Sequence, residues 1–258
     1  MDLNHIMEVA TDAAYKSANL LQSYFGATYE ISKKGAKDLV TEADMASEGI
    51  ISETIAKAFP RHSILAEEGG LNPGIAKYRW LIDPLDGTVN FTHRLNIFAV
   101  SIAFEIEGDI AAAVVLNPTT GEFFSAVTGK GARLNDHPIA VSSVDRIPDS
   151  FLATGLPYDT ADHLESLMSR FRACVAASQG VRRLGSAALD LCFLACGRFD
   201  GYWEENLKPW DTAAGALIAA EAGAKVTDFS NQSYTVEKKQ ILATNGRIHR
   251  QMLSILQI

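Results

Sequence analysis

Two aspartates, Asp83 and Asp86, stand three residues apart, directly after an apolar run that ends at Ile82. Pro84 favours extended backbone at the first aspartate, and Gly87 permits a turn just after the second. This arrangement projects two carboxylates and leaves the amides of the glycine and of the threonine after it to point at an anion. Carboxylate, phosphate and water oxygens are the ligands that Mg²⁺ prefers. The segment therefore predicts a metal and phosphate site, rather than an Asp-Gly surface turn that binds nothing.

Further acidic groups lie elsewhere in the chain. Glu67 and Glu68 end a β-like run, and taken alone such a pair is most often a solvated surface patch. Asp211 follows Pro209 and precedes several small residues, which indicates the first turn of a tightly packed helix. Four of these acids can converge on one metal cluster: Glu67, Asp83, Asp86 and Asp211.

Helical and β periodicities predict the elements that must position these acids. Apolar residues at helical spacing predict a first helix from Leu3 to Tyr24. Thr41 and Asp44 begin a capping box that opens a second helix, which Pro60 closes. Turns join the β-rich runs that follow, so the first half is two helices and a largely antiparallel sheet. These predicted strands cover residues 63–66, 79–82, 97–106, 110–116 and 122–126.

The second half alternates between strands and helices, which predicts an α/β arrangement. Its predicted strands cover residues 151–154, 201–203, 224–227 and 241–243, and its predicted helices cover residues 164–175, 186–196, 209–222 and the C-terminus. No flexible linker separates the two halves near residue 145. We therefore predict a single catalytic domain, residues 1–258, with an N-terminal lobe of about 1–145, a C-terminal lobe of about 146–258 and a cleft between them.

Composition narrows the class of protein. The 258 residues are 47% hydrophobic and 21% charged, which is ordinary for a globular chain, and the net charge is −8. Negative charge argues against a nucleic-acid protein held by a basic surface. The longest apolar run, residues 110–116, is too short to span a bilayer, and the N-terminus lacks a signal pattern. We therefore expect a cytoplasmic protein with no nucleic-acid or membrane partner, whose three cysteines are reduced.

Taken together, these motifs resemble the inositol monophosphatase family of Mg²⁺-dependent, lithium-sensitive phosphatases. The similarity covers nearly the whole chain and rests on Asp83-Pro-Leu-Asp-Gly-Thr-Val-Asn-Phe and Trp210-Asp-Thr-Ala-Ala-Gly, with Glu67-Glu68 upstream. The sequence departs from the family pattern at Asn96 and at Gly69-Gly70. The resemblance implies a sugar-phosphatase fold, which is an α/β sandwich layered αβαβα with a metal-binding cleft, and it implies a homodimer.

The resemblance also implies a role for each matching residue. One Mg²⁺ would be held by Glu67, Asp83 and the carbonyl of Leu85, a second by Asp83, Asp86 and Asp211, and a weaker third by Glu67 through water. The catalytic residues would be Glu67, Thr88 and Asp44, of which the last two orient and deprotonate the attacking water. The substrate-binding residues would be Asp86, Gly87, Thr88, Gly185, Ser186, Ala187, Glu204 and Asp211. Either Lys34 or Lys37 would lie on a mobile loop that closes over the site.

The implied reaction is hydrolysis of a phosphate monoester by direct attack of metal-activated water, with two to three Mg²⁺ ions per site. The substrate would be inositol 1-phosphate or a similar small sugar phosphate, because Glu204 favours a polyhydroxylated leaving group. Fructose 1,6-bisphosphate, histidinol phosphate and 3′-phosphoadenosine 5′-phosphate are the alternatives within related branches. A haloacid dehalogenase would need Asp-x-Asp-Gly-Thr, and this chain has one residue more between its acids. A non-catalytic binding role stays open as a different class.

Overall fold

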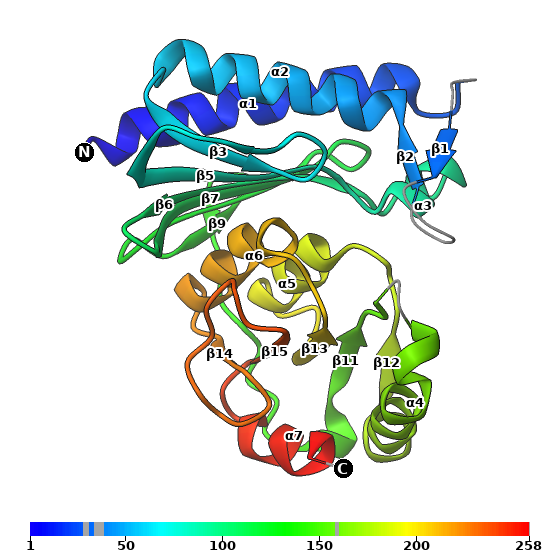
Figure 1. The fold of residues 1–258 in the computed structure, drawn as a ribbon. Coiled ribbons are helices and arrows are strands. Elements are labelled where there is room, and N and C mark those ends of the chain that lie inside the picture. Colours follow the sequence, from blue (N-terminus) through cyan, green and yellow to red (C-terminus); the bar gives the residue numbers. More distant parts are fainter. Residues whose placement is uncertain (28–30, 34–38, 158–159, 258) are drawn as a thin grey trace.

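The computed structural model describes residues 1–27, 31–33, 39–157 and 160–257. Within them the chain forms helices and two large sheets, whose spatial order is shown in Figure 1. The helices are α1 (Leu3–Tyr24), α2 (Glu42–Ala58), α3 (Thr88–Thr92), α4 (Thr160–Ala177), α5 (Ala187–Ala195), α6 (Pro209–Glu221) and α7 (His249–Leu256), with a 3₁₀ turn at Ile147–Asp149.

The first large sheet has eight strands in the order β10-β9-β8-β7-β6-β5-β3-β4. All neighbouring pairs are antiparallel except β3 and β5, which run parallel with Ile64 opposite Trp80. The sheet therefore matches the largely antiparallel arrangement that the sequence predicts. Its strands are β3 (His62–Ala66), β4 (Gly70–Asn72), β5 (Ile75–Asp86), β6 (Ala99–Ile106), β7 (Asp109–Asn117), β8 (Glu122–Val127), β9 (Ala132–Leu134) and β10 (His137–Pro138).

The second sheet has five strands in the order β12-β11-β13-β15-β14. β11 runs parallel to both of its neighbours, whereas β13, β15 and β14 pair antiparallel. Its strands are β11 (Phe151–Thr154), β12 (Gly180–Arg182), β13 (Gly201–Glu205), β14 (Lys225–Thr227) and β15 (Gln240–Thr244), and a separate short pair is formed by β1 (Ile31–Lys33) and β2 (Leu39–Thr41).

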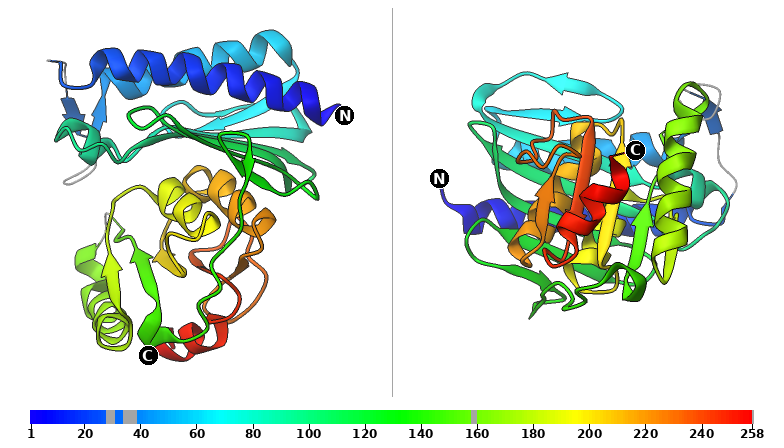
Figure 2. Two further views of the ribbon diagram at one scale, coloured as in Figure 1. Left: turned by 180° about the vertical axis from the view of Figure 1, so that it is seen from behind. Right: turned by 90° about the horizontal axis from the view of Figure 1, so that it is seen from below.

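Five layers of structure alternate between helices and sheets (Figure 1, Figure 2). α1 and α2 cover one face of the eight-stranded sheet, α5 and α6 lie between the two sheets, and α4 and α7 cover the outer face of the second sheet. Each helix thereby buries its apolar side against a sheet. The predicted α/β class with the layer order αβαβα is confirmed.

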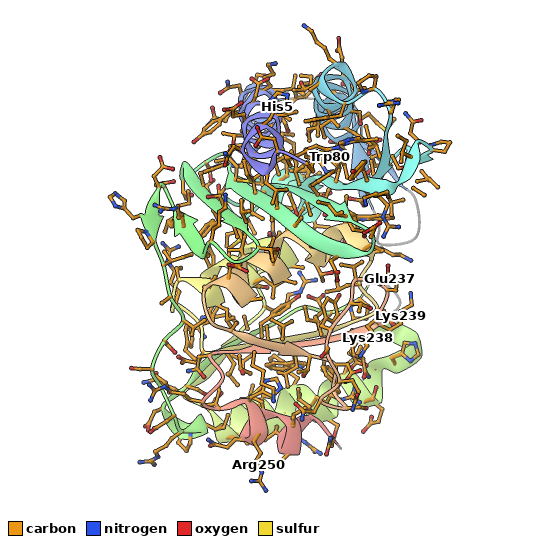
Figure 3. All side chains as sticks on the ribbon, turned by 90° about the vertical axis from the view of Figure 1, so that its left-hand side faces the viewer. His5, Trp80, Glu237, Lys238, Lys239 and Arg250 are labelled. Atoms are coloured by element: carbon orange, nitrogen blue, oxygen red, sulfur yellow. The ribbon has the colours of Figure 1, made fainter. Side chains whose placement is uncertain are left out.

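Aromatic packing fills the layer between α1, α2 and the eight-stranded sheet. Trp80 on β5 is fully buried there, its indole nitrogen donates to His62 Nδ1 at 3.2 Å, and its ring lies 4.9 Å from that of Phe104 (Figure 3). The buried Trp80 donor is thus satisfied, as an apolar interior requires. This packing fixes the strand that continues into the two aspartates at residues 83 and 86.

Close helix packing characterises the middle layer. A Cβ added to Gly215 on α6 would lie 2.7 Å from Leu191 Cβ on α5, so only a glycine allows the two helices to approach this closely. The small residues after Trp210 in the sequence therefore serve packing. This close approach holds α5 and α6 together between the two sheets.

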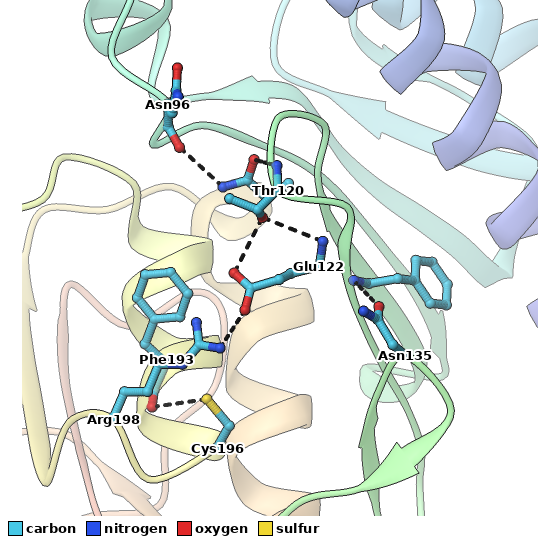
Figure 4. A network of polar contacts seen from close by, with 9 residues as sticks. Asn96, Thr120, Glu122, Asn135, Phe193, Cys196 and Arg198 are labelled. Carbon is cyan, nitrogen blue, oxygen red and sulfur yellow. Dashed lines mark hydrogen bonds and ion pairs between the residues drawn. The ribbon is translucent and has the colours of Figure 1, made fainter.

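A polar network joins the first sheet to the end of α5 (Figure 4). Glu122 at the start of β8 pairs with Arg198, and Thr120 Oγ1 donates to Glu122 Oε2 at 3.2 Å. The Arg198 guanidinium lies 4.9 Å above the Phe193 ring. Cys196 Sγ donates to the Phe193 carbonyl at 3.5 Å. The three cysteines are free thiols, two of them buried and Cys196 partly so. Among the described residues no helix combines the length and apolar character needed to cross a membrane.

Candidate active site

The last residues of β5 leave the regular sheet. The pairing of β5 with β6 shifts register between Asp83 and Asp86, which turns the two carboxylates out of the ladder. Gly87 follows with φ +96°, a left-handed conformation, and caps α3. A Cβ at this position would also lie 2.9 Å from the Ile97 carbonyl oxygen. Glycine is thus required here twice, by the backbone angle and by the close approach.

Thr88 and Asp44 form a buried pair beside this turn. Thr88 Oγ1 lies 3.0 Å from Asp44 Oδ1 and 3.1 Å from the Leu85 carbonyl oxygen, and its one hydroxyl proton is shared between these acceptors. The other Asp44 oxygen accepts the Thr41 amide at 2.8 Å and the Thr41 hydroxyl at 2.5 Å, which completes the predicted capping box at the start of α2. The box therefore fixes the orientation of the carboxylate that holds Thr88.

The start of α5 meets Asp86 from the opposite side. Asp86 Oδ2 accepts the Ser186 hydroxyl at 2.6 Å and the Ala188 amide at 2.8 Å. Asn90 Nδ2 donates to the carbonyls of Ile97 at 2.7 Å and of Leu184 at 2.8 Å, which ties α3 to the loop before α5. Two segments about a hundred residues apart in sequence are thereby joined at the site.

Glu67 follows β3, and its position depends on Glu48 of α2. The Glu48 carboxylate is 9% exposed and accepts two successive backbone amides, those of Glu68 at 2.8 Å and of Gly69 at 2.7 Å. A Cβ at Gly69 would lie 2.6 Å from Glu48 Oε1. The departure from the family pattern at Gly69 thus makes room for this carboxylate. We conclude that Glu48 fixes the turn that carries Glu67.

The C-terminal half contributes two more acids. Asp211 lies in the first turn of α6, where its Oδ2 accepts the Lys208 amide at 2.7 Å. Glu204 on β13 is 7% exposed and accepts a short hydrogen bond from the Tyr202 hydroxyl. A Cβ at Gly155 would collide with the Glu204 carboxylate, so this glycine leaves room for the glutamate.

Nearly all of these groups line a single cavity of about 310 Å³. A volume of this size suits a small molecule. The predicted residues that line it are Glu67, Asp83, Leu85, Asp86, Gly87, Thr88, Gly185, Ser186, Ala187, Glu204 and Asp211. Asp44 is absent from the lining and lies behind Thr88. Lys34 and Lys37 lie outside the described residues.

Four residues of the cavity wall are not among those predicted from the sequence. Arg183, Asp190 and Lys208 supply charged groups to it, and Trp210 supplies an aromatic one. Trp210 belongs to a motif already identified, and Arg183 stands just before one. Asp190 is the one charged residue of the apolar helix α5, and this isolated acid is the sequence feature that could have marked it as a functional residue.

Crowding of the acids changes their proton affinity. Burial raises the pKa of Asp83 well above its usual range, and the nearby charges of Glu67 and Asp86 raise it further. Burial raises the pKa of Asp86 to about 6 despite its hydrogen bonds with Ser186 and Ala188. Burial also raises the pKa of Asp211 well above its usual range. These carboxylates oppose one another's ionisation, so a nearby cation would favour their charged forms.

The donor set fits a hard divalent cation by its chemistry, because it consists of carboxylate and carbonyl oxygens. Within the described part of the chain, no three acidic, histidine or cysteine side chains are already close enough together to hold a metal ion. The Asp83, Asp86 and Asp211 carboxylates are instead each anchored by a backbone amide on one oxygen.

Comparison with known proteins gives one consistent family. A model of the inositol monophosphatase family matches residues 2–258. The inositol-1-monophosphatase of Synechocystis is 44% identical over 99% of this chain and 90% of that protein. The Nus factor SuhB of Pseudomonas aeruginosa is 43% identical over 88% of this chain and 86% of that protein.

Solved structures agree with this result. The extragenic suppressor protein suhB of Bartonella henselae has a TM-score of 0.95 with 40% identity, and the match covers 98% of each chain. An inositol monophosphatase from Anabaena (Nostoc) has a TM-score of 0.91 with 40% identity, over 99% of this chain and 96% of that one. The chain therefore belongs to the inositol monophosphatase family and is a phosphatase, as its sequence predicts.

Proposed function

We propose that this protein hydrolyses small sugar phosphate monoesters, with inositol 1-phosphate as the foremost substrate, by direct attack of water. The observation that carries the proposal is the composition of one cavity wall. Six acids, Thr88 with Asp44 behind it, and the start of α5 surround a single space that suits a small ester. A phosphate dianion repels both hydroxide and carboxylates, so cations must complete this site.

We assign the metal positions to oxygen donors of the cavity. Glu67, Asp83 and the Leu85 carbonyl would hold one Mg²⁺, Asp83, Asp86 and Asp211 would hold a second, and Glu67 would support a weaker third through water. When bound, these ions would neutralise the phosphate, lower the pKa of water and stabilise the leaving alkoxide. The Leu85 carbonyl already accepts from Thr88 and keeps a second lone pair for a cation.

The protein's own proton acceptor is the Thr88–Asp44 pair. Thr88 lines the cavity, and its hydroxyl proton is donated to Asp44 behind it. The lone pairs of Oγ1 are therefore available to accept a hydrogen bond from a water in the cavity. Asp44 acts through Thr88, because it lies behind it. Burial raises the Asp44 pKa, which makes that carboxylate a better proton acceptor. The backbone amides of Gly87 and Thr88 would donate hydrogen bonds to phosphate oxygens.

The leaving group would occupy the side of the cavity formed by Gly185, Ser186, Ala187 and Glu204. Glu204 suits a hydroxylated ring, because burial raises its pKa to about 7 and its carboxyl can exchange hydrogen bonds with hydroxyl groups. This preference places inositol 1-phosphate ahead of fructose 1,6-bisphosphate, histidinol phosphate and 3′-phosphoadenosine 5′-phosphate.

Phosphate release from these four substrates, with and without Mg²⁺ and Li⁺, tests the proposal. Mg²⁺-dependent, lithium-inhibited turnover that is fastest with inositol 1-phosphate is the expected result. Faster turnover of another substrate would retain the mechanism and change the substrate. Absence of turnover of every ester in Mg²⁺ would overturn the proposal.

A second candidate, a non-catalytic binding role, is favoured by the name Nus factor SuhB that several relatives carry. Asp86→Asn separates the two roles, because this change removes a predicted metal ligand and leaves the outer surface unaltered. A cellular function that survives in this variant would be independent of phosphatase activity. We also propose that residues 1–258 form one catalytic domain and assemble as a homodimer, which light scattering would test.

A further inference from the structure

One buried acid of the cavity has no role in the mechanism above. Asp190 lies on α5, is 1% exposed and contributes to the cavity lining. Neither of its carboxylate oxygens has a hydrogen-bond partner among the residues that the structure describes. A buried carboxyl without partners is costly, because its lost hydration is not replaced.

Comparison with a second buried aspartate of the same half shows what a structural role looks like. Asp200 is 5% exposed, accepts the Phe151 amide at 2.7 Å and also accepts the Ser142 hydroxyl. It therefore joins β11 to the segment before it. Asp190 makes no such contact, so its side chain contributes nothing of this kind to the fold.

The surroundings of Asp190 favour a neutral carboxyl group. Burial raises its pKa well above the usual range, and the charges of Glu204 and Asp86 raise it further. Arg183 opposes this effect, but its guanidinium does not bond to either oxygen. A neutral carboxyl has one hydroxyl donor and acceptor oxygens, which is also the pattern that an alcohol offers.

We propose that Asp190 is a specificity-determining residue that, together with Glu204, binds the hydroxyl groups of an uncharged polyol leaving group. The inference rests on the proposed phosphatase function and adds one residue to its leaving-group side. Both acids belong to the C-terminal half, and they line the cavity together with Glu67, Asp83 and Asp86 of the N-terminal half. A polyol that enters this side of the cavity would supply Asp190 with the partners that the protein does not.

An uncharged leaving group fits better than a charged one. A second phosphate placed here would be repelled by the ionised form of Glu204, which a pKa of about 7 keeps populated at neutral pH. An ammonium group would instead favour an ionised Asp190, which the burial and the neighbouring charges of Glu204 and Asp86 oppose. The geometry and charge therefore select neutral hydroxyls.

Two substitutions of Asp190 test the proposal through their effect on different leaving groups. Asp190→Asn keeps a donor and an acceptor, whereas Asp190→Leu has a similar shape and neither. We expect Asp190→Leu to lower kcat/KM for inositol 1-phosphate about tenfold and to leave that for 4-nitrophenyl phosphate, which lacks hydroxyls, within twofold. Asp190→Asn should stay within about threefold of wild type on both esters.

Thermal unfolding distinguishes this role from a structural one. Asp190→Leu should unfold at or above the wild-type temperature, because it removes an unsatisfied buried carboxyl. Asp200→Asn is the matched control, which should lower the melting temperature and leave the ratio of the two activities unchanged.

Three results would overturn the assignment of Asp190. The first is an equal loss on both esters in Asp190→Leu, and the second is no loss on either. The third is a loss in Asp190→Asn that is confined to histidinol phosphate, which would indicate an ionised partner for an amine. Wild-type turnover in Mg²⁺ keeps the tests separate, because absence of turnover of every ester, 4-nitrophenyl phosphate included, would refute the phosphatase function itself.

Discussion

At the scale of single residues, the site depends on acids that the fold holds against their mutual repulsion. Asp83, Asp86 and Asp211 each direct one oxygen to a backbone amide, at 3.1, 2.8 and 2.7 Å respectively. The amides partly compensate the lost hydration of these buried carboxylates, whose charges oppose one another. The protein therefore stores unfavourable electrostatic energy that a divalent cation would relieve.

Asp86→Asn tests this balance. The amide oxygen of Asn can still accept from Ser186 and Ala188, so the metal-free variant should be at least as stable as wild type in thermal unfolding. Activity in Mg²⁺ should fall about 100-fold or more, because a ligand and its charge are lost. Exposed Asp109→Asn is the control and should change neither quantity. A variant with wild-type turnover would refute the assignment of Asp86 as a ligand.

Glu48→Gln tests the support of Glu67. A Gln side chain has one acceptor oxygen, so one of the two amides of Glu68 and Gly69 would face an NH₂ group instead. We expect the Mg²⁺ concentration for half-maximal activity to rise about tenfold, as for other groups that orient a metal ligand. Calorimetric Mg²⁺ titration should show the same loss of affinity. Glu53→Gln, exposed on the same helix, should have no effect; an unchanged Mg²⁺ affinity in Glu48→Gln would exclude the positioning role.

At the scale of elements, the site is formed where strands end and helices begin. β3 ends at Ala66, just before Glu67, and β5 ends at Asp86, whereas α5 and α6 begin beside Ser186 and Asp211. Helix N-termini present free amides and partial positive charge, which favours the carboxylates placed there. The layered packing brings these four ends to one cavity.

Gly87→Ala tests how closely these ends approach. Gly87 and Gly121 both have positive φ, +96° and +69°, but a Cβ at Gly121 would meet nothing within 4 Å. Gly121→Ala should therefore cost about 1–2 kcal/mol of unfolding free energy for the backbone angle alone and leave turnover unchanged. Gly87→Ala adds a collision with the Ile97 carbonyl, so it should cost more and reduce kcat about 100-fold by displacing Thr88. Equal unfolding costs in urea would show that the close approach is unimportant.

At the scale of the whole molecule, the features that could be predicted from the sequence are those that depend on neighbouring residues. The long helix α1, the capping box at Thr41 and the strands at residues 63–66, 79–82, 110–116 and 122–126 follow from periodicity and turn residues, and they are confirmed. The Glu48 and Asp190 features were not predicted, because each depends on contacts between segments distant in the chain. Glu48 accepts hydrogen bonds from residues that are 20 and 21 positions away. Asp190 stands out because neither of its carboxylate oxygens has a hydrogen-bond partner among the described residues, which only the folded structure reveals.

Global stability should depend on pH through His249, which joins α7 to the second sheet. The ring is 2% exposed, with Nε2 3.0 Å from Thr227 Oγ1 and Nδ1 2.9 Å from Thr244 Oγ1. The Thr227 hydroxyl donates its proton to the Asp228 carbonyl, so toward the ring it can only accept a hydrogen bond, and Nε2 must carry a proton. In a neutral ring Nδ1 is then unprotonated and accepts a hydrogen bond from the Thr244 hydroxyl. This arrangement requires a neutral imidazole.

Burial, and to a lesser extent the charge of Lys225, lowers the pKa of His249 to about 4 from an ordinary value of 6.5. Between those values the unfolded chain binds more protons than the native one, so acid favours unfolding. The histidine should thus contribute stability that is present above pH 6.5 and lost as the pH falls to 4, by at most about 3 kcal/mol. Urea unfolding of wild type and His249→Gln across this window isolates the contribution, because the difference between them cancels the titration of the acidic cavity. A difference that stays constant from pH 7 to pH 4 would show that the buried ring accepts a proton as readily as the unfolded one.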